Sequence, residues 1–282
     1  INRSNMDYVG LFGCIQQGYI SNLRLENVKV AGCTSVGGLV GGIALGVIEN
    51  CTVTGEVYGS SGVGGLIGDN LILNTIIDSS TDVNVSGEEY VGGLAGTNII
   101  SVISGSNAAG MVEGTEIVGG LVGANINALV EDSFSRSQVL GHNVIGGLVG
   151  INLDAFATDS SIDGGKMAEN SKSIVDDLMD KSTSSKMDDI LTLINVRINQ
   201  IVEEFSGKAS FEDIKKDVRI SDWKSIYEKE LTSSLVRKAK DKDVSESSDD
   251  FSSLIISCHA EGDVRGNGNV GGLVGGNYRW II

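Results

Sequence analysis

A six-residue segment recurs along most of the chain and constrains its fold more than any other feature. It reads Val-Gly-Gly-Leu-Val-Gly at residues 36–41, and close copies stand at 63–68, 91–96, 118–123, 145–150 and 270–275. A shorter version, Val-Gly-Leu-Phe-Gly, occupies residues 9–13. The motif leucines are 28, 27, 28, 27 and 27 residues apart at Leu11, Leu39, Leu66, Leu94, Leu121 and Leu148. Self-similarity at a fixed period indicates a repeat protein.

Each repeat predicts short strands and turns. In the second repeat, Thr52, Val53, Thr54 and Val57 favour extended backbone, and the glycines and serines at 59–62 favour a turn. A helix would have to absorb the paired glycines at a cost of about 1 kcal/mol each. Strands related by translation along the repeat must pair in parallel, about 4.8 Å apart. The fold class expected is mainly β, a parallel β-helix (solenoid) with two or three strands in each rung.

The motif leucines are expected to face inward in a column, meaning a row of equivalent residues from successive rungs. The members are Leu39, Leu66, Leu94, Leu121, Leu148 and Leu273. Strict strand alternation would place Val40 on the face opposite Leu39. Either the Gly37–Gly38 pair bends the chain and resets the phase, or one of those two columns faces outward.

A second column follows four residues after the motif leucine. It holds asparagine in five rungs, at Asn70, Asn98, Asn125, Asn152 and Asn277, whereas the first two rungs carry Ile15 and Ile43. Stacked amides can hydrogen-bond to one another because each carries both donors and an acceptor. The pattern therefore predicts an asparagine ladder along the axis, and the alternative is a row of solvent-facing amides that binds sugar.

The four cysteines fit no zinc or redox spacing, since no C-x-x-C is present. Cys51 and Cys258 lie 15 residues before a motif leucine, at the repeat position where other rungs have Ser79, Ser106 and Ser133. This position predicts a column of small, semi-buried residues.

The repeat is interrupted after residue 163. Between residues 164 and 250 glycine nearly disappears, Lys and Arg rise to fifteen, and an apolar stripe at helical spacing includes Ile190, Ile194, Ile198 and Ile201. The domain organisation expected is a repeat coil at 1–163, an α-helical insertion at 164–250 and the final rung or rungs at 251–282. Ser160 and Cys258 are equivalent in the repeat, so either a further rung lies between them or only one of the two segments occupies the strand. The insertion either covers the coil or binds a partner.

The G-L-x-G core of the repeat resembles the GLUG repeat of bacterial cell-surface, adhesin-like proteins, which also occurs in non-catalytic parts of some immunoglobulin A-cleaving metallopeptidases. The resemblance covers most of residues 1–163 and 251–282. It implies a parallel β-helix carried outside the cell, and it transfers no active-site residue.

Charge and motifs exclude several classes of function. A net charge of -16 opposes nucleic-acid binding, which requires clustered Lys and Arg. No H-E-x-x-H and no calcium-loop pattern is present, and we expect His142 and His259 to be turn or surface residues. No metal, cofactor or catalytic residue is therefore expected. No run of 18 strongly apolar residues exists, so no membrane span is expected in this sequence, which begins inside a repeat like a piece of a larger protein.

One enzymatic alternative remains open at this point. Asp132 and Asp159 are equivalent in neighbouring repeats, and by the leucine count Asp78 is one position out of that column. Stacked carboxylates about 5 Å apart are compatible with a retaining glycosidase pair. A polysaccharide lyase or hydrolase is thus a third class of function.

The function expected is a non-enzymatic structural or adhesive segment of a surface protein, extracellular or on the cell surface. Its partners would be a host-surface protein, a glycan or neighbouring domains of a larger chain. The second hypothesis is a non-catalytic, substrate-positioning domain of a large secreted peptidase.

Overall fold

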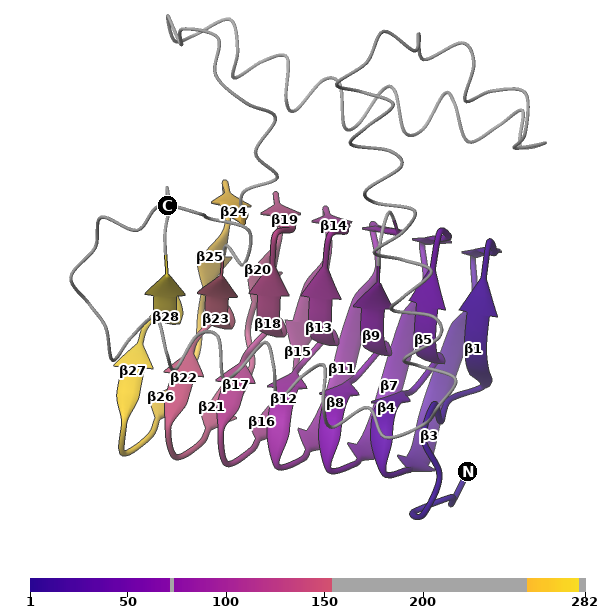
Figure 1. Cartoon of the computed structure of the whole chain (residues 1–282), viewed down its shortest axis with the longest axis horizontal. Helices are drawn as coiled ribbons and strands as arrows, with labels where there is room; N and C mark the ends of the chain where they lie inside the picture. Colours follow the sequence, from indigo (N-terminus) through magenta and orange to yellow (C-terminus); the bar gives the residue numbers. More distant parts are fainter. Residues whose placement is uncertain (72–73, 154–252, 279–282) are drawn as a thin grey trace, which may run out of the picture. The chain divides into compact units, whose positions relative to one another are not determined.

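The computed structural model describes residues 1–71, 74–153 and 253–278. In these residues the chain winds into a parallel β-helix, and Figure 1 shows equivalent strands side by side from the indigo N-terminal rung to the yellow C-terminal rung. The prediction of a parallel β-helix is confirmed. The predicted helical insertion at 164–250 lies outside the described residues.

Four parallel sheets run along the coil, here numbered in chain order. The first sheet contains β1 (Phe12–Gln16), β5 (Val40–Ala44), β9 (Ile67–Leu71), β13 (Ala95–Ile99), β18 (Val122–Ile126), β23 (Val149–Leu153) and β28 (Val274–Tyr278). The second contains β2 (Tyr19–Ser21), β6 (Val47–Glu49), β10 (Thr75–Ile77), β14 (Val102–Ser104), β19 (Leu129–Glu131) and β24 (Leu254–Ile256).

The third sheet contains the most strands, because in some rungs two short strands contribute to it. It contains β3 (Arg24–Ala31), β7 (Thr52–Tyr58), β11 (Ser80–Ser86), β15 (Asn107–Ala109), β16 (Met111–Glu113), β20 (Phe134–Ser135), β21 (Gln138–Leu140), β25 (His259–Ala260) and β26 (Val264–Arg265). The fourth contains β4 (Thr34–Gly37), β8 (Ser61–Gly64), β12 (Glu89–Gly92), β17 (Ile117–Gly119), β22 (Val144–Gly146) and β27 (Asn269–Gly271).

A rung therefore passes through four sheets, and the expectation of two or three strands per rung is wrong. The difference arises at the corners, where non-glycine residues take left-handed backbone conformations. Leu45 has a φ of 55° between β5 and β6, and Asn50 has a φ of 49° between β6 and β7. A single residue in this region turns the chain sharply, so a corner needs no loop.

The motif bends the chain between the fourth and first sheets. β4 ends at Gly37 and β5 begins at Val40, and the side chains of both Leu39 and Val40 are fully buried. The Gly37–Gly38 pair therefore bends the chain so that Leu39 and Val40 both face inward, and neither column faces outward. Glycine is needed here because a Cβ on Gly38 would lie 2.6 Å from the carbonyl oxygen of Gly65 in the next rung.

The last described rung stacks directly on the rung before the interruption. β24 pairs with β19 through Leu129–Leu254 and Glu131–Ile256, so no rung lies between them. Ser160 and Cys258 are equivalent in the repeat. The segment with Cys258 is the one that continues from β24, which is a strand of the second sheet. Residues 154–253 thus intervene between β23 and β24 in the sequence.

Candidate functional site

The motif leucines form a column in the core. Leu39, Leu66, Leu94, Leu121 and Leu148 have no exposed surface, and Leu273 in the last rung is partly buried. Each of the first five leucines donates its backbone N–H to the carbonyl of the next leucine in the column, at 2.8–2.9 Å. Successive rungs therefore place like side chains on one another.

The asparagines form a continuous chain of hydrogen bonds along the axis. The Nδ2 of Asn70 donates to Asn98 at 2.7 Å, and the pattern continues from Asn98 to Asn125 and from Asn125 to Asn152 at 2.8 Å. Asn152 donates to Asn277 at 3.0 Å. The first four side chains are buried, so the alternative of a solvent-facing amide row is wrong for them.

Sequence reasoning missed the residue that closes this ladder at its N-terminal end. The rung before Asn70 carries Ile43, which offers no donor to the Asn70 Oδ1. Asn74 supplies one through its own Nδ2. Among the described residues, the Oδ1 of Asn74 is the buried side-chain oxygen with no hydrogen-bond partner. The signal in the sequence was an asparagine four residues after the first asparagine of the column.

The serine and cysteine column makes a second set of hydrogen bonds between rungs. The hydroxyls of Ser79, Ser106 and Ser133 donate to the carbonyl two residues earlier at 2.7–2.9 Å, and they accept the backbone N–H of the preceding rung at 3.1–3.2 Å. The thiols of Cys51 and Cys258 make the same contact at 3.3 and 3.1 Å. Burial raises the pKa of both thiols, so these cysteines hold the corner as neutral groups.

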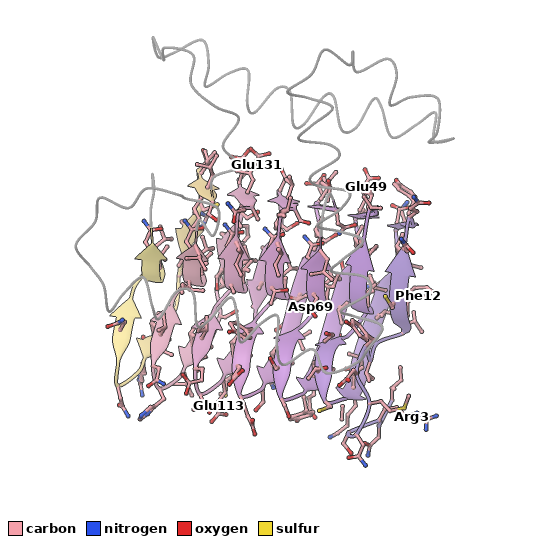
Figure 2. All side chains as sticks on the ribbon, viewed as in Figure 1. Arg3, Phe12, Glu49, Asp69, Glu113 and Glu131 are labelled. Atoms are coloured by element: carbon pink, nitrogen blue, oxygen red, sulfur yellow. The ribbon has the colours of Figure 1, made fainter. Side chains whose placement is uncertain are left out.

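A cluster of polar side chains lies where the fourth sheet meets the first. Its central residue is Asp69, which Figure 2 labels. The Asp69 carboxylate accepts hydrogen bonds from the Ser35 hydroxyl and from the Thr97 hydroxyl, the latter at 2.8 Å. Gly62 leaves room for it, since a Cβ there would lie 2.8 Å from the Asp69 Oδ1. Tyr8 lies over Gly42, the residue paired with Asp69.

Burial governs the electrostatics of this cluster. It raises the pKa of the Asp69 carboxyl, while the hydrogen bonds from Ser35 and Thr97 oppose the shift. Burial and then the Asp69 charge raise the pKa of Tyr8, and the same two causes raise that of Cys14. The tyrosine and the thiol therefore stay protonated beside the carboxylate.

The outward face of the third sheet carries aromatic rings next to cations. The rings of Phe134 and His259 stack in neighbouring rungs with centroids 5.0 Å apart, and the Arg136 guanidinium lies 4.6 Å from the Phe134 centroid. Arg136 also pairs with Glu261 at 3.1 Å. At the N-terminal end of the same sheet, Lys29 lies 5.9 Å from the Tyr58 ring.

The carboxylate column needs a correction. Ile77, Ser104, Glu131 and Ile256 pair in sequence, so the next residues are aligned as Asp78, Gly105, Asp132 and Ser257. Asp78 is therefore in the column of Asp132, because one extra residue between Asn70 and Asp78 shifts the leucine count. Asp132 has Gly105 and Ser257 as its neighbours in this column. Asp159 lies outside the described residues.

The two histidines lie on the surface, where His259 stacks on Phe134 and His142 contacts the side chain of Asn267 at 3.0 Å. Within residues 1–71, 74–153 and 253–278, no group of three or more His, Cys, Asp or Glu side chains could hold a metal ion. The same part of the chain contains no helix with the length and apolarity needed to cross a membrane.

Comparison with known proteins supports the resemblance read from the motif. The GLUG motif matches residues 32–58. Halomucin from Haloquadratum walsbyi is 44% identical over 87 residues, which is 30% of this chain and 1% of that protein. The chain thus spans a very small part of this relative. The resemblance to GLUG-repeat proteins is confirmed.

Among solved structures, the chain is similar to a crystal structure of a Bacteroides ovatus protein that carries an immunoglobulin A1 protease designation. The two are 22% identical, with a TM-score of 0.35. The similarity covers 46% of this chain and 53% of the other.

Proposed function

The chain carries GLUG repeats stacked as a parallel β-helix, and from this premise we propose that it is a non-enzymatic structural segment of a larger extracellular or cell-surface protein. Its outward surface binds a host protein or a glycan. The observation that carries the structural part is the continuity of the buried columns, in which every inner leucine and asparagine contacts its equivalent in the next rung. A coil built in this way extends by adding rungs without a new core.

The outward face of the third sheet supports the binding part of the proposal. Phe134, Arg136, His259 and Glu261 combine aromatic surface with charged groups of both signs. Aromatic and arginine side chains contribute strongly to protein and ligand recognition. These residues come from neighbouring rungs, so only the stacked coil brings them together.

The test is a binding screen of the full chain against glycan and host-protein panels. We expect at least one ligand whose affinity falls about tenfold or more in a Phe134→Ala, Arg136→Ala double variant, as expected when an anchoring contact of about 1.4 kcal/mol is lost. Glu49→Gln, on the second sheet, is the matched control and should keep full affinity. Failure to bind any panel member would contradict the adhesive role. Release of soluble sugar from a polysaccharide panel would contradict the non-enzymatic role.

A further inference from the structure

The corner between β23 and β24 has the same frame as the corner one rung earlier, between β18 and β19. β18 pairs with β23, and β19 pairs with β24. The earlier corner consists of two residues, Asn127 and Ala128. Ser253 directly precedes β24 as Ala128 directly precedes β19, so the two residues are equivalent. Residues 154–252 therefore stand in the place of one corner residue, Asn127.

The hydrogen bonds at the base of this segment repeat those of the earlier corner. Asn125 Nδ2 donates to the carbonyl of Ala128 at 2.9 Å, and Asn152 Nδ2 donates to the carbonyl of Ser253 at 3.3 Å. Ser253 is fully buried, and its hydroxyl donates to the carbonyl of Leu153. The residues that flank the segment on its two sides are thus in direct contact.

The rung that follows the segment pairs with the coil in all four sheets. β24 pairs with β19, β25 and β26 pair with β20 and β21, β27 pairs with β22, and β28 pairs with β23. Leu148 and Val149 donate their backbone N–H groups to the Leu273 carbonyl at 2.8 and 3.0 Å, as their equivalents do in the inner rungs. Every partner in these contacts lies outside residues 154–252, so the pairing itself does not require that segment.

We infer that residues 154–252 are a guest segment, and that the coil closes across their base through a corner equivalent to a single residue. The inference also extends the proposed function and, in that part, rests on it. Phe134 and Arg136 precede the segment, whereas His259 and Glu261 follow it, and closure of the corner brings the four side chains together. The coil is then a carrier whose binding face is separable from the segment that it carries.

A variant in which one asparagine replaces residues 154–252 tests the inference. The corner residue must take a left-handed conformation, as Asn127 does with a φ of 46°, and asparagine and glycine adopt this region most readily. Hydrogen exchange of residues 129–149, whose amides donate to the last rung, should stay within about twofold of the full chain. A glycine-bridged variant should give the same result. Loss of protection in both variants would overturn the inference, because the segment would then support the coil.

The matched control joins Leu153 directly to Ser253. An extended residue spans about 3.6 Å at most, so the direct join leaves the corner one residue short. Exchange of residues 129–149 should then increase by about tenfold or more, because the last rung opens locally. Equal protection with and without the bridging residue would refute the one-residue equivalence.

The full chain allows a measurement that deletes nothing. A site-specific protease sequence between Gly164 and Gly165 permits cleavage of the folded protein within the segment. Protection of residues 129–149 should survive the cut, and its loss would overturn the inference. Ligand binding separates this result from the proposed function, since retained protection without any panel ligand would contradict the adhesive role alone.

Discussion

At the scale of single residues, the buried asparagines hold the coil through their donors and acceptors together. Asn125 accepts from Asn98, donates to Asn152, and donates also to the Ala128 carbonyl at 2.9 Å. Replacing it removes partners from three buried polar groups at once. A buried group without a partner costs more than the hydrogen bond contributes when made.

We therefore predict that Asn125→Leu lowers the free energy of unfolding by about 2–4 kcal/mol, since each orphaned buried group costs about 1–3 kcal/mol and relaxation recovers a part. Chemical denaturation measures the change. Asn84→Leu is the control, because Asn84 is exposed and water can replace it as the acceptor of the Met111 N–H. If both variants lose the same free energy of unfolding, an asparagine of the ladder stabilises the protein no more than an exposed asparagine does.

The position of the asparagine column could be predicted because it recurs at a fixed distance from the motif leucine. The Asp69 cluster could not be predicted in this way. Asp69, Ser35 and Thr97 each occur once, at positions where other rungs carry different residues. Asp69 and Thr97 are equivalent in neighbouring rungs, so the repeat period brings these two together. The contact of Asp69 with Ser35 depends instead on the stagger between the fourth and first sheets, and the period carries no information on that stagger.

At the scale of elements, the second glycine of the motif sets how closely consecutive rungs approach. A Cβ on Gly65, Gly93 or Gly120 would lie 2.1–2.3 Å from the carbonyl oxygen of the equivalent glycine in the next rung. At Gly272, in the last described rung, the same Cβ would meet no heavy atom within 4 Å. The steric requirement thus comes from the stacked neighbour and not from the bend itself.

This difference predicts opposite outcomes for one substitution at two equivalent positions. Gly120→Ala should destabilise the protein by about 2 kcal/mol or more, because the backbone of two rungs must move apart. Gly272→Ala should change stability by less than about 0.5 kcal/mol, as surface substitutions usually do. Thermal and chemical unfolding of the two variants provide the comparison, and a comparable loss at Gly272 would show that the bend alone requires glycine.

Strand type and parallel pairing could be predicted from the motif, whereas the division of a rung into four strands could not. The corners depend on left-handed residues as different as Leu45, Asn50 and Asp78. Leucine gives no sequence signal for such a conformation, since it is strained there and is held by the rungs above and below.

At the scale of the whole molecule, each rung contacts only its neighbours, and the end rungs of the described coil have a neighbour on one side. Leu11 is 50% exposed and Val270 is 44% exposed, whereas their equivalents in the inner rungs are fully buried. In such linear arrays, stability is a sum of rung and interface contributions.

We predict that amide protection at neutral pH is highest between Leu66 and Leu148 and decreases toward residues 9–16 and 269–276. Native-state hydrogen exchange resolves such local opening. Uniform protection along the coil would instead indicate one all-or-none unit, contrary to nearest-neighbour stacking.

Two changes of chain length fall at one corner of the coil, whereas the extra residue of the first rung forms an irregularity inside β3, between Leu25 and Val28. The extra residue before Asp78 and residues 154–252 both fall between a strand of the first sheet and the following strand of the second. Despite the long intervening sequence, β24 pairs with β19 in the same register as the strands that follow shorter corners. This corner therefore accepts insertions. We expect that foreign sequence can be inserted after Ile99 or Ile126, at a chosen position along the axis of the coil, without disturbing the rungs on either side.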